Sequence, residues 1–425
     1  MGLRKNQNKL TDAEKARFVA AVKKMKADTA AAYNYDKFVT IHDAAFTGDV
    51  NTNPAHMGPS FFPWHRYFLL KFERDLQAAD TALGGDGSLT LPYWDWTHDN
   101  ANESNRQRGS IWRDTFMGGF GDPVSTGPFR DGQWAIVGGG PLVRAFGRTA
   151  IDGNAAPSLP TKGQIDAALD LDGFDCDPFD DSVTTRPALP SPGAPTLSGA
   201  AAGTLAAGTY RVCVTYVNVR GETRPSRPTS ICLGAGCSPA NAFKSITVAA
   251  PPARPSAIGY NVYVTQPDGA AGTETLHGAV RPMGAPATIT AVAVGTGLPS
   301  VNTTGSFRNE LEGWLAAVAN HNRVHMWVAG SMASGTSPND PIFFIHHCNI
   351  DRLWALWQFR HPGQNYPPVV PNVGIPGNRP HGLTDPMPPW TAAPELQRPI
   401  DMLNHQALGY TYDTDPVGAA INTAP

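Results

Sequence analysis

The chain has 425 residues, of which 41% are hydrophobic and 16% charged, which is enough for two or three compact domains. Its formal net charge is −3 and it has no basic run, so we expect no nucleic-acid partner. No apolar run reaches the ~18 residues of a membrane span, and the first residues lack the apolar segment of a signal peptide. We therefore expect no membrane association, and either a cytoplasmic protein or one exported with a partner.

Two predicted helices open the chain. Thr11 and Glu14 have the form of a capping box, and the helix that they start is expected to run to about residue 30. The second helix begins near Tyr35, where apolar residues recur at steps of three and four. His42 belongs to this apolar face, so we expect its imidazole to point into the interior.

A third helix is predicted within the segment AHMGPSFFPWHRYFLLKFE, residues 55–73. His56 lies in a loop before a Gly-Pro pair, and His65 opens a helix with a continuous apolar seam. With His42, these residues form a first group of three histidines. The Gly- and Pro-rich region that follows contains one predicted helix, residues 161–169.

The composition changes over residues 186–305, which contain no tryptophan although the chain has ten. Apolar residues alternate in 210–216, 258–264 and 288–294, and turn residues separate these runs. The pattern predicts an inserted all-β sandwich domain of the immunoglobulin or fibronectin type III kind.

Three of the five cysteines, Cys213, Cys232 and Cys237, lie in this β region. Five cysteines in so long a chain do not form a disulfide framework, so we expect free or partly paired thiols. A structural zinc site with His277 as fourth ligand is the less favoured alternative.

Sequence patterns typical of helices resume at about residue 306, and the stretch from 321 to 357 contains a second group of three histidines. His321 and His325 are four residues apart, so on a helix they share one face. Asp340 and Pro341 predict the start of another helix, as N-cap and first-turn residues. His347 lies on the apolar seam of that helix.

Six imidazoles on apolar faces indicate metal binding. A single buried histidine is usually a hydrogen-bonded core residue, but two groups of three without a carboxylate are better explained by two metal ions. Neutral imidazole suits Cu, Zn, Fe and Ni, and three imidazoles per ion leave positions open for other ligands. A di-iron carboxylate centre is disfavoured because it requires glutamate ligands.

The two histidine segments resemble the copper-site motifs of the tyrosinase family of type 3 copper proteins. HMGPSFFPWHRYFLLKFE is similar to the first motif, and HNRVHMWV with SPNDPIFFIHHCNIDRLW to the second. The LPYWDWT segment is also similar, as are Tyr410 and Tyr412 near the end and Arg4 near the start. The nearest likeness is to short bacterial tyrosinases.

This resemblance implies a mainly α fold, a four-helix bundle holding a dinuclear copper site, with the all-β sandwich inserted. The tyrosinase core would consist of residues 1–185 and 306–425, and the insertion of residues 186–305. The resemblance assigns the copper ligands as His42, His56 and His65 for one ion and His321, His325 and His347 for the other. His346 is similar to a family histidine that is not a ligand.

Two further residues are implied to act in catalysis. Asn322 is similar to a family asparagine that, with an upstream glutamate, holds a water proposed to take the phenol proton. The segment FRNELEGW nominates Glu312. On one unbroken helix Glu312 would turn about 180° away from His321, so this role requires a break near Gly313, and Glu310 is the alternative.

The implied function is O2-dependent ortho-hydroxylation of monophenols and oxidation of o-diphenols to o-quinones, with small phenols as substrates. The alternatives are a catechol oxidase or o-aminophenol oxidase without monophenolase activity and, less expected, an oxygen carrier. Some bacterial relatives need a separate protein to load copper, so a copper-loading helper is a candidate partner. The β insertion is a candidate for shielding the copper site in cis.

Overall fold

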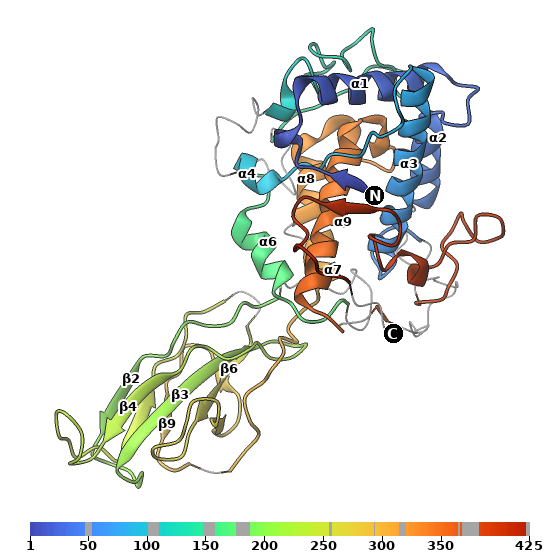
Figure 1. The fold of residues 1–425 in the computed structure, drawn as a ribbon. Helices are drawn as coiled ribbons and strands as arrows, with labels where there is room; N and C mark the ends of the chain where they lie inside the picture. The colour runs from blue at the N-terminus through green and yellow to red at the C-terminus, as the bar shows by residue number, and fades with distance from the viewer. Residues whose placement is uncertain are drawn as a thin grey trace. The chain divides into compact units, whose positions relative to one another are not determined.

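The computed structural model describes most of the chain. The described residues are 1–46, 53–100, 110–147, 158–175, 188–254, 257–292, 294–313, 320–363, 366–367 and 382–421. The chain divides into two compact units (Figure 1). The first unit comprises Met1–Asp170, Phe174–Thr185 and Phe307–Pro425, and the second Leu171–Gly173 and Arg186–Ser306.

The first unit is rich in helices. These are α1 (Asp12–Ala27), α2 (Asp36–Ala45), α3 (Phe61–Ala82), α4 (Trp96–Asn100), α6 (Lys162–Leu169), α7 (Phe307–Glu312), α8 (Asn320–Val328) and α9 (Ile342–Arg360). The capping box of Thr11 and Glu14 is present at the start of α1, which confirms that prediction. The helix predicted at 161–169 is α6. None of the described helices has the length and apolar character that a membrane crossing requires.

The helix that carries His347 begins one residue later than predicted. Pro341 is the residue before α9, and Ile342 is its first helical residue. The Asp340 Oδ1 still accepts a hydrogen bond from the Ile342 amide at 3.1 Å, as an N-cap side chain does. The same carboxylate is held by the buried Arg144, with Nη2 to Oδ1 at 2.7 Å. Asp340 therefore fixes the entry to α9 through an ion pair as well as through capping.

Both ends of the first unit meet in a short parallel pairing of β1 (Gly2–Arg4) with β10 (Tyr410–Tyr412). The guanidinium of Arg4 lies 3.5 Å from the centroid of the Tyr410 ring and donates to the Tyr412 hydroxyl at 3.1 Å. Arg4 also forms a buried ion pair with Glu73 of α3 at 2.6 Å. Arg4 and the two tyrosines, which the resemblance singled out separately, are therefore in direct contact.

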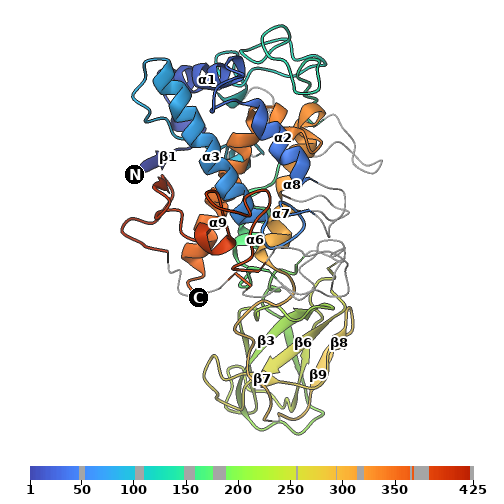
Figure 2. The ribbon, with the colours of Figure 1, turned by 90° about the vertical axis from the view of Figure 1, so that its right-hand side faces the viewer.

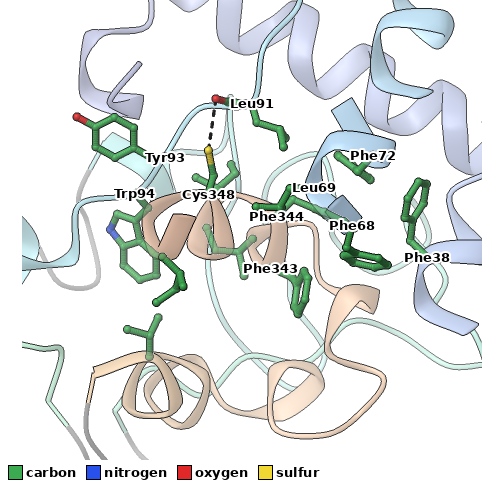
Figure 3. Packing of buried hydrophobic residues seen from close by; sticks show 14 of the residues in the cluster. Phe38, Phe68, Leu69, Phe72, Leu91, Tyr93, Trp94, Phe343, Phe344 and Cys348 are labelled. Atoms are coloured by element: carbon green, nitrogen blue, oxygen red, sulfur yellow. Dashed lines mark hydrogen bonds between the residues drawn. The ribbon is translucent and has the colours of Figure 1, made fainter. Parts of the chain in front are cut away.

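Aromatic rings fill the space between the helices that carry histidines. Phe38 of α2, Phe72 of α3 and Phe344 of α9 meet there (Figure 3). The Phe72 and Phe344 rings stack with centroids 3.5 Å apart, and the Phe38 and Phe72 rings meet edge to face at 5.1 Å. Cys348 is also buried, with its Sγ 3.7 Å from the Leu91 carbonyl oxygen. Truncating a buried phenylalanine to alanine costs roughly 3–5 kcal/mol, so this packing fixes the helices firmly.

The second unit consists of β-strands (Figure 2). They are β2 (Leu197–Ala200), β3 (Gly208–Val217), β4 (Thr229–Leu233), β5 (Ser245–Val248), β6 (Gly259–Val264), β7 (Thr275–Leu276), β8 (Arg281–Pro282) and β9 (Ala287–Ile289). One sheet has the order β2-β5-β9 and the other β4-β3-β6-β7, with β8 pairing with β6. Alternate side chains of β3 and β6 pack with residues of β5 and β9 in one apolar cluster, so the two sheets share a core.

Two predictions for this unit need correction. The run expected over 288–294 forms a strand only at Ala287–Ile289, and Val294 is 94% exposed. Cys232 and Cys237 form a disulfide, while Cys213 is free and buried. The expectation of partly paired thiols is thus confirmed, and the zinc alternative is wrong, because the disulfide consumes two of the thiols that it required.

Candidate metal centre

The six predicted ligands come from four helices and one loop of the first unit. His42 lies on α2 and His65 on the first turn of α3, and His56 is in the loop before α3. The remaining three are His321 and His325 on α8 and His347 on α9. Figures 1 and 2 show α2, α3, α8 and α9 gathered in one part of the unit. All of these side chains except His325, which is partly exposed, are buried.

The first group is compact and internally oriented. Among the described residues, His42, His56 and His65 form one of two clusters in which each residue offers a ligand atom within 4.8 Å of the others. The Nδ1 of His42 donates to the Gly335 carbonyl at 2.6 Å, and that of His65 to the Phe61 carbonyl at 2.8 Å. These bonds set the tautomer, so each Nε2 presents a lone pair.

The second group converges more tightly. The Nε2 atom of His321 lies 3.1 Å from that of His325 and 3.2 Å from that of His347, and the last pair is 3.2 Å apart. The His325 Nδ1 donates to the Met332 carbonyl at 2.8 Å, and the His321 Nδ1 lies 3.3 Å from the Glu312 carbonyl. His321 and His325 therefore turn their lone pairs toward a common point.

Both groups fit a metal ion by the arrangement of their Nε2 atoms. The buried Nε2 atoms of His42 and His65 have no hydrogen-bond partner within the described part of the chain. In the second group, lone pairs that face one another at 3.1–3.2 Å repel unless a cation lies between them. The centre of such a triangle is about 1.8 Å from each nitrogen, close to the roughly 2.0–2.1 Å of a metal–imidazole bond.

Burial keeps these imidazoles neutral. It lowers the pKa of His42 to about 3 and that of His325 to about 4. Burial and the neighbouring histidines also hold the pKa of His65, His321 and His347 well below its usual value. At neutral pH each ring therefore carries a lone pair for a metal rather than a second proton.

The two groups adjoin each other. The His65 and His347 rings stack with centroids 4.4 Å apart, and the His56 and His321 rings are 6.3 Å apart. Phe343, one turn before His347, stacks on its ring at 4.1 Å. Two ions bound in these groups would be neighbours in an apolar, water-poor setting.

His346 lies within reach of the second group, although the resemblance likens it to a family histidine that is not a ligand. A ligand atom of His346 is within 4.8 Å of those of the other three residues of the group. Its ring is parallel to that of His321, with centroids 5.2 Å apart, and is also in contact with Trp96 at 5.3 Å. It is fully buried.

A cavity of about 190 Å³ opens beside both groups. The histidines that line it are His42, His56, His321 and His325. Its other walls come from α8 and from the loops that flank the histidines, namely Phe46, Asn322, Met326, Met332, Ala333, Ser334 and Ser337. A mostly apolar chamber with two metal groups on one wall accepts a small, flat, weakly polar molecule.

Comparison with known proteins identifies the architecture. The family profile described as the common central domain of tyrosinase matches residues 32–174 and 203–360. The tyrosinases of Streptomyces glaucescens and Streptomyces lincolnensis are each 31% identical over 426 residues, covering 98% of this chain and 100% of each relative. The chain belongs to the tyrosinase family.

Other relatives are more distant. Grixazone synthase from Streptomyces griseus is 29% identical over 448 residues, covering 97% of this chain and 99% of that protein. A functional unit of octopus hemocyanin matches with a TM-score of 0.45 and 17% identity, covering 99% of this chain and 70% of that chain. That structural likeness is too weak to bear on function.

As a tyrosinase-family member, the chain is a copper-dependent monophenol monooxygenase and catechol oxidase. Its cofactor is a dinuclear type 3 copper pair and its co-substrate is dioxygen. The two clusters of neutral imidazole side chains suit this cofactor, because Cu is among the metals that neutral imidazole prefers.

Asn322 lines the cavity, whereas Glu312 is not among the lining residues and contacts Met57 and Arg308 instead. Asn322 lines the cavity, between His321 and Met326 on α8. Helix α7 ends at Glu312, and Gly313 follows with φ +75°, so the required helix break is present. The Glu312 carboxylate is buried; it accepts from the Met57 amide at 2.6 Å and from Arg308 Nη1 at 2.9 Å.

Glu310 is less buried than Glu312, and its backbone carbonyl accepts from the Asn320 Nδ2 at 2.6 Å.

Several cavity residues were not predicted from the sequence. Ser337 is 1% exposed, and its Oγ has no hydrogen-bond partner in the described part of the structure. It lies, like Met332 and Ser334, in the loop between α8 and α9. The one sequence signal that could have indicated these residues is that their loop is short. A short loop between two helices that both carry ligands must pass close to the metal groups.

Proposed function

We propose that the protein hydroxylates monophenols at the ortho position and oxidises o-diphenols to o-quinones, using two copper ions held by the two histidine groups. His42, His56 and His65 would hold one ion and His321, His325 and His347 the other. When bound, the copper pair would pass electrons from the phenol to O2, so that a phenol and O2 give an o-quinone and water. The observation that supports this most is the convergence of three Nε2 atoms at 3.1–3.2 Å in the second group.

Copper stoichiometry tests the ligand assignment. We expect about two copper ions per chain in the wild type and about one in H65Q and in H347Q, because each variant leaves the other group intact. The matched control is H277Q, which alters a histidine outside both groups. Two ions retained in H347Q, or a loss of copper in the control, would contradict the assignment.

The phenol proton must be accepted by polar groups of the chain itself. A phenol has a pKa near 10, so it must lose its proton to a nearby acceptor before its oxygen can bind a metal strongly. We propose that Asn322 and Glu312 hold a water that takes this proton. The Glu312 carboxylate accepts from the Met57 amide, next to the ligand His56, and from Arg308, so it is held close to the first histidine group.

The contacts of Glu312 suggest a positioning effect as well. Met57 follows the ligand His56 and has φ +59°, and its amide is held by the Glu312 carboxylate. We expect E312Q to lower monophenol oxidation more than diphenol oxidation if the carboxylate serves the proton. Equal losses accompanied by copper loss would assign Glu312 to holding the loop of His56. E310Q serves as control and should retain both activities.

The same assays separate the alternatives. A catechol oxidase or o-aminophenol oxidase would oxidise catechol but not tyramine at matched copper content. An oxygen carrier would bind O2 without turnover of either substrate. We expect tyramine oxidation, with N322A slowing it at least about tenfold relative to catechol, since a positioned proton acceptor contributes roughly 10²–10⁴-fold.

The finer architecture is also proposed. We regard α2, α3, α8 and α9 as a four-helix bundle around the copper pair, built from residues 1–185 and 306–425. The shared core of the two sheets supports an inserted β-sandwich of fibronectin type III kind at residues 186–305. Its proposed role is to shield the copper site in cis. Deleting residues 187–304 would then change copper retention or substrate range, and an unchanged enzyme would reject this role and leave shielding and copper loading to a helper protein.

A further inference from the structure

The first unit contains a second cavity, of about 170 Å³, between α6, α9 and the segment that begins α4. Asp95 and Thr97 line it near α4, and the remaining walls are side chains of α6 and α9. Among the described residues, its lining shares no member with that of the copper-site cavity. The reaction proposed above does not use it.

A buried cation that has no counter-ion among the described residues faces this cavity. Arg352 is only 7% exposed, and its guanidinium lies 4.5 Å from the centroid of the Tyr93 ring. Its Nε donates to the Asn349 Oδ1 at 2.8 Å. Within the described part of the chain, no carboxylate lies within ion-pair distance of Arg352, whereas the buried Arg4, Arg66, Arg144 and Arg308 each have one. Burial of an unpaired charge is costly, so Arg352 calls for an anionic partner.

A buried amide donor faces the same cavity. Asn349 is 1% exposed and precedes Arg352 by one turn of α9. Its Oδ1 is occupied by Arg352, and its Nδ2 has no hydrogen-bond partner among the described residues. Two neighbouring side chains thus leave N–H groups unused at one cavity, and a buried donor without an acceptor is rare in native proteins.

The other lining residues add charge and apolar surface. Lys162 and Arg360 bring the cavity's cations to three, against the two carboxylates of Asp95 and Asp166. Asp166 pairs with Lys162, and the Asp95 Oδ1 accepts from Thr97. The apolar walls are Ile165 and Leu169 of α6 and Leu353 and Leu356 of α9.

We propose that this cavity binds a small organic carboxylate with a short apolar body. The carboxylate would accept from the guanidinium of Arg352 and from the Asn349 Nδ2, because a planar carboxylate matches the fork of an arginine. Its hydrocarbon portion would lie between the leucine and isoleucine side chains of α6 and α9. An inorganic anion would leave that apolar surface uncovered.

Hexanoate titrated into the copper-loaded full-length enzyme tests the site, with binding measured by calorimetry and 1-hexanol as the uncharged control ligand. We expect R352Q to weaken hexanoate at least about tenfold, as the loss of a charge-assisted bond does. L356W should abolish binding by filling the cavity, since Leu356 is partly exposed and its replacement leaves the core intact. K24Q removes a like charge from a side chain that lies outside the cavity and already pairs with Asp28, and it should bind hexanoate like the wild type.

Three outcomes would overturn the proposal. Hexanoate bound equally by wild type, R352Q and L356W would mean that it binds elsewhere, for example at copper. Binding of 1-hexanol as tight as that of hexanoate would remove the role of the charge. No binding to the wild type up to about 20 mM, an affinity weaker than about −2 kcal/mol, would mean that the cavity holds water only. Copper content and tyramine oxidation verify that each variant is folded. If R352Q does not fold, hexanoate binding to L356W alone tests the proposal.

Discussion

Replacing Asp351 by asparagine should destabilise the first unit more than any exposed ion-pair variant. Asp351 lies on α9 one turn after the ligand His347, and it is buried. Four donors converge on its carboxylate, namely Arg66 Nε at 2.5 Å, Arg4 Nη1 at 3.2 Å and the hydroxyls of Tyr410 and Tyr412 at 2.6 Å each. Although burial opposes ionisation, Arg66 and Arg4 hold the pKa of Asp351 below its usual range.

The magnitude follows from which charges keep a partner. In D351N, Arg4 retains its ion pair with Glu73 at 2.6 Å. Arg66 keeps the Met402 carbonyl at 2.8 Å and longer contacts with the Leu403 carbonyl at 3.3 Å and Gln358 Oε1 at 3.5 Å, all uncharged, so among the described residues it loses its counter-ion. Removing one partner of a buried pair costs about 3–5 kcal/mol. With an m-value of about 3 kcal/mol per M, the urea midpoint should fall by about 1–1.7 M.

Tryptophan fluorescence gives the assay. All ten tryptophans lie outside residues 186–304, so the signal reports the first unit and not the β unit. The matched control is D170N, which removes a carboxylate 3.5 Å from Arg360 at an exposed site and should cost less than about 0.5 kcal/mol. A loss of 1 kcal/mol or less in D351N would refute the claim that the network neutralises a buried charge.

Three other results are expected. Burial raises the pKa of Asp99 to about 6, so the folded state binds this proton more tightly than the unfolded chain does. The contribution to the free energy of unfolding is complete below about pH 4 and should be lost, by up to about 3 kcal/mol, as the pH rises through 6. Urea unfolding of D99N should not show this difference between pH 4 and pH 7. Burial raises the pKa of Cys213 to about 12, so peptide mapping after iodoacetamide treatment at pH 8 should find this thiol unlabelled, and native labelling would contradict its burial. Chelating the copper should lower the fluorescence-monitored urea midpoint, because the ion binds only the folded groups, and identical midpoints would argue against two preformed sites.

Local patterns in the sequence determined the helices and their histidines. The capping box at Thr11, the helix at 161–169 and the apolar faces bearing His42 and His347 follow from spacing alone, because a helix places residues three and four apart on one face. The strand content of residues 186–305 was visible for the same reason, since alternation marks a half-buried strand. The motifs also carried the family, because two ligand groups at these spacings are specific.

Only the tertiary structure showed which other residues these side chains contact. The pairing of Cys232 with Cys237, the proximity of His346 to the second group and the contacts of Glu312 with Met57 and Arg308 join positions that local pattern does not relate. The cavity between α6 and α9 likewise depends on helices nearly 200 residues apart. Periodicity tells which face of a helix turns inward, but the neighbour on that face is chosen by the packing of the whole chain.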